Sequence, residues 1–563
     1  MHATLQAELF PKSRLSIDAL DFFSNAVPDA RGAVHTRPEI AEFILDSVGW
    51  IKSEPLDSLC LLEPSVGEGD FLLPAVERLM SRFSTDDLSI QNCIRAVEVN
   101  RTALQRCRER LHTLLVEKGW SPNIVDGVLE KWLLHDDFLS VSFDRNFSHI
   151  VGNPPYIRLE HLPKELLKAY RSRWSSLFDR ADLYVAFIEN SLELLKPEGR
   201  LGFICADRWM KNRYGGPLRS IVAKEFHLES YVDFTGCPAF FDEVDAYPAV
   251  TIIRKGRGDS TRVAFRPAIS RECLVPLAKA LTSRKEHPQV TLLSGICRGD
   301  QPWSFNENGG MDIIRKLEAN FPVLEATGCK VGIGVATGAD AIFIAPDAHL
   351  DVEPERKLPL VTTKDIRNGE VEWGGRYVLN PFEDDGRLVD PNQYPKFRAY
   401  IESHREIIQK RNVAIRNPKG WFRTIDRIHA SLTSTPKLLI PDIKGEAHVV
   451  FEKGCYYPHH NLYFVTSESW DLKVLQMILR SRIAHGFIVA YSPRMRGNFL
   501  RFQAQYLRRI RIPQIEKMDK LLKTEVLSAS RSSSQRAKDD IIQKLYNLSD
   551  KEWAQMDPNI LTA

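Results

Sequence analysis

The sequence lacks the features that would tie this protein to a membrane or to an oxidising compartment. None of its nine cysteines forms a Cys-x-x-Cys pair or falls at the spacing of a His/Cys metal site. Residues 1–14 contain no apolar signal core, and no apolar run is long enough to span a bilayer. We therefore expect a cytoplasmic protein with reduced thiols, no membrane association and no metal.

The chain also has little net charge. Its 76 Lys and Arg side chains nearly balance 73 Asp and Glu, which leaves a formal charge of +3. Global charge therefore does not identify a nucleic-acid partner, and any basic surface must come from local clustering. With 563 residues, 43% of them hydrophobic, the composition is typical of a globular protein of two or three domains.

Patterning divides the chain into four parts. Apolar runs alternate with helical patterns in the first half, which predicts a βα-repeated parallel sheet, and the Lys255–Ser260 run interrupts this pattern. A serine-rich run at 528–534 predicts a flexible hinge near the end. We expect an N-terminal extension (1–30), an α/β domain (31–257), a mixed α+β domain (258–515) and a helical tail (516–563).

The tetrapeptide Asn153-Pro154-Pro155-Tyr156 follows the strand-like run 147–152. Two consecutive prolines cannot continue a strand, so the chain must leave the sheet here, at the edge where α/β sheets bind ligands. The Asn153 amide oxygen and the Pro154 carbonyl can accept both hydrogens of an exocyclic amine, and Tyr156 can stack on its ring. By itself the tetrapeptide could also be a plain β-turn.

A strand–turn–helix pattern upstream predicts a cofactor site. An apolar strand ends at Glu63 and Pro64, and the turn contains Gly67 and Gly69, which allow close approach of a ligand to backbone N–H groups. The spacing differs from that of dinucleotide-binding turns. A carboxylate at Glu63 would repel a pyrophosphate and suit an ammonium, which favours S-adenosylmethionine (AdoMet).

Further polar residues follow the neighbouring strands. Glu98 ends the next strand, where an acid commonly holds ribose hydroxyls. Asp137 could accept a hydrogen bond from the adenine amine of AdoMet, with Phe138 against the ring, and Asp136 is an alternative. Thr36 begins a Thr-x-x-Glu capping-box pattern whose helix N-terminus could bind the AdoMet carboxylate.

Two basic and aromatic patches lie in the later half of the chain. One contains Arg411, Lys419 and Trp421. The other, from residue 480 to 513, has no Asp or Glu, and its candidate DNA contacts are Arg494, Arg496, Arg501 and Arg508. Arginine suits phosphates and guanine edges, and aromatic rings suit exposed bases. We predict that most of these residues contact phosphate.

As an ordered set, these motifs resemble the gamma-class, TaqI-like DNA adenine-N6 methyltransferases of type II restriction-modification systems. The resemblance covers about residues 34–255, and more loosely the later half. It implies a class I AdoMet-dependent methyltransferase (Rossmann-like) domain plus a target-recognition domain. It also implies that an aromatic residue of a late hairpin packs on the extruded adenine; we prefer Phe241 over Phe240.

The resemblance implies a reaction that depends on orientation and electrostatics. The adenine is flipped out of the duplex, Asn153 and Pro154 draw N6 towards the AdoMet methyl, and Tyr156 and Phe241 replace the lost stacking. The expected partner is double-stranded DNA, in a prokaryotic cytoplasm. Pro441-Asp442 lacks a convincing nuclease partner motif, so we expect cleavage by a separate cognate endonuclease. We expect a monomer.

Other interpretations share parts of this pattern. RNA and protein-glutamine methyltransferases also carry Asn-Pro-Pro-Tyr, but they are usually shorter and lack a comparable second domain. Cytosine-N4 methyltransferases more often have Ser at the position of Asn153. A catalytically silent DNA-binding subunit of a defence complex is a further alternative, against which the intact motifs argue.

Overall fold

The computed structural model describes residues 19–23, 34–241, 248–283, 286–303, 305, 310–367, 369–444, 448–492 and 500–557. The chain forms two compact units, residues 1–307 and 308–563, and each is described by itself. Arg494 and Arg496 lie outside the described residues, and so does the side chain of Arg501.

The first unit is built on a nine-stranded sheet with the order β3-β2-β1-β4-β5-β7-β6-β8-β9. Neighbours from β3 to β5 are parallel, whereas β7 runs antiparallel to both β5 and β6. The strands are β1 (Leu61–Glu63), β2 (Ile94–Glu98), β3 (Leu133–His135), β4 (Phe147–Gly152), β5 (Leu195–Ala206), β6 (Phe226–Asp233), β7 (Pro248–Lys255), β8 (Ser260–Phe265) and β9 (Thr291–Ser294).

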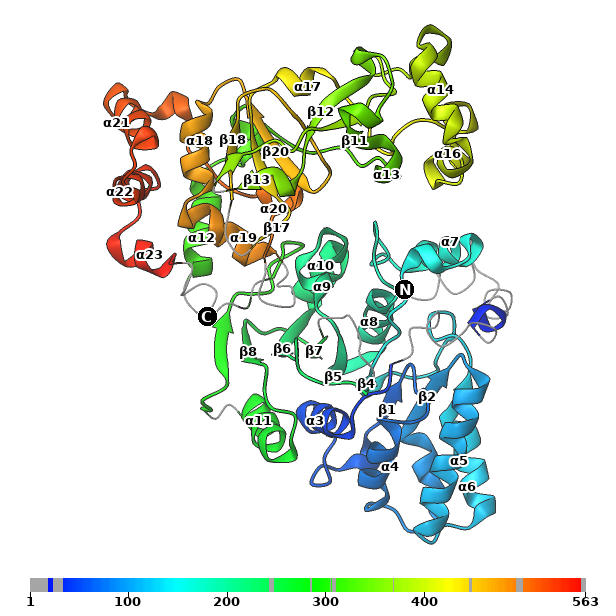
Figure 1. The fold of residues 1–563 in the computed structure, drawn as a ribbon. Coiled ribbons are helices and arrows are strands. Elements are labelled where there is room, and N and C mark those ends of the chain that lie inside the picture. Colours follow the sequence, from blue (N-terminus) through cyan, green and yellow to red (C-terminus); the bar gives the residue numbers. More distant parts are fainter. Residues whose placement is uncertain are drawn as a thin grey trace, which may run out of the picture. The chain divides into compact units, whose positions relative to one another are not determined.

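Helices cover both faces of this sheet (Figure 1). One core contains residues of α3 (Pro38–Val48), α4 (Leu72–Met80), α5 (Arg101–Glu117), α6 (Pro122–Trp132) and α11 (Arg271–Ser283). The other contains residues of α7 (Lys164–Arg173), α8 (Tyr184–Glu193), α9 (Arg208–Lys211) and α10 (Gly216–Glu225). Because both faces are covered, β4 is an almost continuous buried run, as in other parallel sheets.

The sequential order of the strands runs one way from β1 to β3 and the other way from β4 to β5, and the candidate site lies at this change between β1 and β4. Since β1, β2 and β4 are parallel, their carboxyl ends lie at the same edge of the sheet. Glu63 ends β1, Glu98 ends β2, and Asn153 follows β4 directly. Open α/β sheets bind their ligands at such a switch point.

The boundary between the two units differs from the prediction. The break at 255–260 is a tight connection within the sheet, because β8 pairs in parallel with β6 and β9 continues the sheet beyond it. Helix α11 then returns to pack against α3. Residues 258–307 therefore complete the α/β unit, and the division between the two compact units lies at 307 rather than at the predicted 257.

The second unit is a mixed α+β structure. Its two four-stranded sheets have the orders β10-β20-β16-β18 and β11-β15-β12-β19. Their strands are β10 (Cys329–Ile333), β20 (Leu462–Ser467), β16 (Lys437–Pro441), β18 (Val450–Glu452), β11 (Ile344–Pro346), β15 (Arg376–Leu379), β12 (Lys357–Val361) and β19 (Tyr457–Pro458), and two short pairs join β13 (Ile366–Arg367) to β14 (Glu370–Val371) and β17 (Ile443–Lys444) to β21 (Leu500–Arg501).

Helices surround these sheets. They are α12 (Gly310–Asn320), α13 (Asp340–Phe343), α14 (Pro395–Ser403), α15 (Arg405–Ile408), α16 (Asn412–Arg416), α17 (Ser431–Ser434), α18 (Leu472–Leu479), α19 (Arg482–Tyr491) and α20 (Ala504–Leu507). None of the helices in the described part of the chain is both long and apolar enough to cross a bilayer.

The C-terminal helices belong to this unit rather than forming a separate tail. Helix α21 (Lys520–Arg531) extends through the first serines of the run at 528–534, so the predicted hinge shrinks to a short turn. Helices α22 (Gln535–Leu545) and α23 (Asp550–Gln555) follow. Val526, Ile542 and Tyr546 are buried in the same core as α18 and α19, and this packing fixes the helices in place.

Candidate active site

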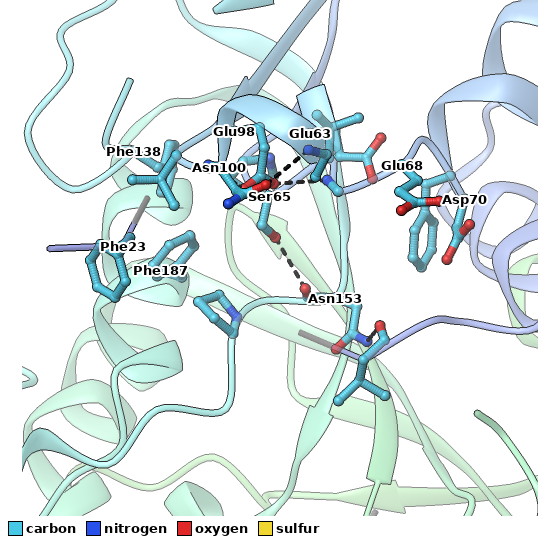
Figure 2. A pocket seen from close by; sticks show the side chains of 18 of the residues that line it. Phe23, Glu63, Ser65, Glu68, Asp70, Glu98, Asn100, Phe138, Asn153 and Phe187 are labelled. Carbon is cyan, nitrogen blue, oxygen red and sulfur yellow. Dashed lines mark hydrogen bonds between the residues drawn. The ribbon is translucent and has the colours of Figure 1, made fainter. Parts of the chain in front are cut away.

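A cavity of about 490 Å³ opens at the carboxyl edge of β1, β2 and β4. Figure 2 shows Phe23, Phe138 and Phe187 gathered at one side and Glu68 and Asp70 at the other. Glu63, Gly67, Glu98, Asp137 and Asn153 also line the cavity, together with Thr36, Pro64, Asp136 and Pro155. The residues predicted to bind a cofactor thus come together around one cavity, except for Gly69, whose neighbours Glu68 and Asp70 line it.

The glycine turn and Glu98 hold each other. One carboxylate oxygen of Glu98 accepts a hydrogen bond from the Gly67 N–H at 2.8 Å, and the other accepts one from the Asn100 N–H at 2.8 Å. Gly67 and Gly69 both have positive φ, 54° and 95°. A side chain at Gly69 would also collide with Leu73, because a Cβ would lie 2.5 Å from its Cδ1 atom. The two hydrogen bonds from Gly67 and Asn100 hold the Glu98 carboxylate at the wall of the cavity.

Glu63 is a buried acid without a partner. Its side chain is 1% exposed, and its Oε2 atom accepts no hydrogen bond from any residue that the structure describes. Burial raises the pKa of Glu63 well above its usual value, and the nearby charges of Asp70 and Glu98 raise it further. A cation in the cavity would stabilise the ionised form, so this end of the cavity fits the methionine ammonium of AdoMet.

The opposite end of the cavity is apolar and fits an adenine ring. Phe138 is 2% exposed, and its ring centroid lies 5.1 Å from that of Phe187. The sequence analysis did not single out Phe23 or Phe187. Phe187 lies in α8, the second α-helix after the Asn-Pro-Pro-Tyr motif, whereas nothing in the sequence places residues 19–23 near the cavity.

The structure leaves the choice between Asp136 and Asp137 open. Asp137 is buried, and its carboxylate accepts hydrogen bonds from the Leu139 N–H, the Ser140 hydroxyl and, at 3.0 Å, the Tyr170 hydroxyl. Burial raises its pKa, although these hydrogen bonds act in the opposite direction. Asp136 is half-buried and accepts the Asp137 N–H at 2.7 Å.

The Asn153 amide has a defined orientation. Its Nδ2 atom donates to the Val34 carbonyl at 3.1 Å and to the Thr36 hydroxyl oxygen at 3.3 Å, and its own backbone carbonyl accepts from Ser65 Oγ at 3.0 Å. The Oδ1 atom is buried and has no hydrogen-bond partner among the described residues. An unpaired buried acceptor costs about 1–3 kcal/mol, so this oxygen is set for a donor on a ligand.

Thr36 does not form the predicted capping box. Helix α3 begins at Pro38 with Arg37 at the N-cap position, and no side chain caps it. Thr36 lies one residue before the N-cap position, so its hydroxyl does not accept from the N–H groups of the first turn. The capping-box prediction is wrong, and the Thr36 hydroxyl faces Asn153 instead.

Three aromatic side chains lie beyond Asn153. The Tyr156 ring is half-buried and meets Phe240 edge-on at 6.3 Å between centroids. Phe240 is 7% exposed, whereas Phe241 is 65% exposed and lies beneath the Arg37 guanidinium. An exposed ring can accept a base without repacking the core, which supports our preference for Phe241; its role stays a prediction.

In the second unit, Arg411 and Trp421 have structural surroundings. The Arg411 guanidinium donates to four backbone carbonyls, those of Thr337, Ile408, Trp421 and Arg423. Burial lowers its pKa to about 10. Trp421 is 8% exposed and belongs to a hydrophobic core. Since backbone carbonyls occupy the Arg411 guanidinium and Trp421 packs in the core, we no longer propose either as a DNA contact.

Arginines of the 480–513 segment, which contains no Asp or Glu, form ion pairs with acidic residues from other parts of the chain. Arg508 pairs with Glu325 at 3.2 Å, Arg509 with Glu318 at 3.3 Å, and Arg482 with Asp539 at 3.7 Å. We therefore expect fewer of these arginines to contact phosphate than the sequence alone predicts, because ion pairs within the unit neutralise part of their charge. Lys419 is exposed, as a phosphate contact requires.

Comparison with known proteins identifies the family. Residues 88–240 match the Eco57I restriction-modification methylase model, and residues 358–512 match the TaqI-like C-terminal specificity domain. Over 542 residues the chain is 49% identical to the type II methyltransferase M.PaeR7I of Pseudomonas aeruginosa, covering 94% of both chains. It is 48% identical to M.XhoI of Xanthomonas vasicola, over 93% of this chain and 99% of the relative.

This chain belongs to the TaqI-like family of type II restriction-modification methyltransferases. The predicted family, enzyme class and cofactor are thereby confirmed: it is an AdoMet-dependent DNA methyltransferase of the adenine-N6 type. The 358–512 match lies within the second unit, which is the specificity domain.

Solved structures agree on the fold of this methyltransferase. It resembles the type IIL restriction-modification enzyme MmeI, solved in complex with DNA, with a TM-score of 0.60 and 13% identity, over 98% of this chain and 79% of that one. The type ISP enzyme LlaGI gives a TM-score of 0.52 over 89% of this chain and 46% of that one. The predicted combination of a Rossmann-like domain with a mixed specificity domain is confirmed.

Proposed function

We propose that this methyltransferase holds a flipped-out adenine with Asn153 Oδ1 and the Pro154 carbonyl as paired acceptors for the two hydrogens of N6. The observation that carries this proposal is the buried, unpartnered Oδ1 atom of Asn153. The Val34 carbonyl determines the orientation of the Asn153 amide, because a carbonyl can only accept and must therefore face the NH2 group.

The acceptors act on the geometry of the nucleophile. The lone pair of N6 is delocalised into the purine ring, which makes the amine a poor nucleophile. Two acceptors that bind both N6 hydrogens draw the nitrogen towards a pyramidal arrangement and localise its lone pair. AdoMet supplies a methyl group activated by the sulfonium charge. Preorganised acceptors of this kind stabilise the transition state without a metal or covalent nucleophile.

The base must leave the duplex to reach this site, because N6 inside a helix cannot approach the cavity. We propose that the Tyr156 ring and Phe241 supply the stacking that the base loses. Base–aromatic stacking contributes about 1–3 kcal/mol per base. The half-buried ring of Tyr156 and the 65% exposure of Phe241 support these roles.

The cavity divides into two ends for the cofactor. We propose that Glu63 receives the ammonium, that Glu98 receives the ribose hydroxyls, and that Phe138 packs on the adenine. Pro64, Gly67 and Gly69 shape the turn beneath them. Asp136 or Asp137 receives the adenine amine. The phenylalanines and the unpaired carboxylate stand at opposite sides of the cavity, which supports this direction of binding (Figure 2).

We propose double-stranded DNA as the substrate, contacted in the specificity domain by Lys419, Arg494, Arg496, Arg501 and Arg508. We also propose that a separate endonuclease performs cleavage and that the methyltransferase acts as a monomer in a prokaryotic cytoplasm. The proposal of a separate endonuclease is supported by M.XhoI, which is named a methyltransferase alone and is covered to 99% by this chain; RM.Eco57I, named a restriction enzyme and methyltransferase, is covered to 40%.

Asn153→Ala tests the catalytic proposal. Removing Oδ1 should lower single-turnover methylation of duplex DNA by about a thousandfold, in line with the loss of one preorganised group in other enzymes. AdoMet affinity, measured by calorimetry, should stay near that of the wild type. The product is identified by nucleoside mass analysis of the DNA; a modified base other than N6-methyladenine, or a variant with wild-type turnover, contradicts the proposal.

A further inference from the structure

The segment Val34–Arg37 contacts three parts of the active site that are far apart in the sequence. Its Val34 carbonyl and Thr36 hydroxyl accept from Asn153 Nδ2. The Thr36 N–H donates to Asp70, at the end of the glycine turn, at 3.1 Å. On its other side the segment pairs with residues 239–241 through a bridge between Thr36 and Phe240.

Two further backbone hydrogen bonds fix this pairing. The Arg37 N–H donates to the Ala239 carbonyl at 3.3 Å, and the Phe241 N–H donates to the His35 carbonyl at 3.2 Å. The segment is thus held to the loop that carries Phe240 and Phe241. Because Thr36 is only 2% exposed, its hydroxyl has little access to water that could replace these contacts.

We propose that Thr36 is a positioning residue for methyl transfer: its hydroxyl oxygen, with the Val34 carbonyl, locks the Asn153 amide so that Oδ1 faces the target amine. This inference rests on the proposed role of Asn153 and replaces the expectation that Thr36 binds the cofactor. Without the Thr36 hydroxyl, the Asn153 NH2 group would keep its hydrogen bond to the Val34 carbonyl. It would lose the second hydrogen bond, which fixes the plane of the amide.

The same segment joins the amide to its surroundings on both sides. Asp70 holds it to the cofactor turn, and the pairing with 239–241 holds it to the aromatic residues proposed to receive the base. The Asn153 amide, the cofactor turn and the aromatic residues are therefore all held by one short stretch of backbone. A displacement of about 1 Å can cost about a hundredfold in rate, so this shared support matters for catalysis.

Thr36→Val tests the inference, because valine keeps the shape and removes the hydroxyl. At saturating AdoMet and DNA, the single-turnover rate constant should fall by about 10- to 100-fold. The dissociation constant for AdoMet should change by less than about twofold, since the hydroxyl acts on Asn153 and not on the cofactor. Thr36→Ser, which restores the acceptor, should return the rate to within about threefold of the wild type.

A matched control is Thr261→Val, which removes a buried threonine hydroxyl that donates to the Leu228 carbonyl in the same unit. It should leave the rate constant unchanged. If Thr36→Val proves unstable in thermal unfolding, Thr36→Ala is measured in its place, with the same expected loss of rate.

Three outcomes overturn the inference. They are a wild-type rate for Thr36→Val, a loss confined to AdoMet affinity, and a Thr36→Ser variant as slow as Thr36→Val. The Asn153→Ala variant separates this inference from the proposed function. If Asn153→Ala is inactive and Thr36→Val is not impaired, only the positioning role fails; if Asn153→Ala is active, the catalytic proposal itself fails.

Discussion

Among the described residues that line the cavity, two carry a buried side-chain oxygen without a hydrogen-bond partner. Glu63 Oε2 and Asn153 Oδ1 are both buried, and both lie on side chains that line the same cavity. Each such atom costs stability unless a partner is bound. Ligands with matching chemistry are an ammonium for Glu63 and an amine hydrogen for Asn153. These two oxygens support the roles proposed for Glu63 and Asn153.

The proposed role of Glu63 predicts that the affinity for AdoMet depends on pH. Burial raises the pKa of Glu63, so ionising the carboxyl to pair with an ammonium costs less free energy as pH increases. Affinity for AdoMet should therefore rise as pH increases towards the raised pKa. Calorimetry in buffers of different ionisation enthalpy should detect this proton release.

Glu63→Gln is the control for this pH effect, because glutamine keeps the shape but cannot ionise. The variant should bind AdoMet more weakly at high pH and lose the rise in affinity with pH. Any titration of AdoMet itself affects both proteins equally, so their difference isolates Glu63. Parallel pH profiles for the two proteins would contradict the assigned role.

At the scale of elements, the stretch 480–513 shows the limit of reading charge along the chain. It contains no acidic residue, yet Glu318 of α12 and Asp539 of α22 pair with its arginines. Arg411 illustrates the same point with backbone carbonyls as partners. A run of one sign predicts a solvated or DNA-facing surface only when no distant element supplies the opposite charge.

Arg411 and Lys419 should respond differently to alanine substitution. Arg411→Ala leaves several carbonyls unpaired and should lower the free energy of unfolding by about 2–4 kcal/mol. Lys419→Ala should leave stability unchanged and reduce the slope of log affinity for DNA against log salt by about one. Denaturant unfolding and salt-titrated DNA binding measure the two effects. An unchanged salt slope for Lys419→Ala would remove Lys419 from the proposed interface.

At the scale of the whole molecule, the catalytic unit depends on residues beyond its sequence motifs. β8 covers the edge of β6, and α11 packs on α3, the helix that follows the 34–37 segment. These late elements stabilise the framework on which Asn153 is positioned. The second unit has hydrophobic cores of its own, which include its C-terminal helices.

Truncation tests this boundary. A fragment of residues 1–307 should be soluble and bind AdoMet, whereas a fragment of residues 1–257 should aggregate. The shorter fragment exposes the backbone edge of β6 and the apolar surface of α3, and unprotected strand edges promote aggregation. Solubility, circular dichroism and AdoMet calorimetry compare the two fragments. Equal AdoMet affinity in both would restore the boundary predicted from the sequence.

Much of the catalytic unit could be predicted from the sequence, because its signals are local. Strand β4 and the exit at Asn153 follow from an apolar run ended by two prolines, and the glycine turn follows from Gly67 and Gly69. These patterns act through backbone dihedrals and missing donors, which depend on few neighbours. The order of such motifs was sufficient to identify the family and the cofactor.

Tertiary structure alone decided which groups face each other. The bond between Asn153 and Val34 spans 119 residues, and the acids that neutralise Arg508 and Arg509 lie 183 and 191 residues away in the chain. Such pairings arise only when the sheet and its loops close in space, so no local pattern encodes them. The motifs in the sequence therefore determined which chemical groups the site contains, whereas the fold determined how these groups are oriented towards one another.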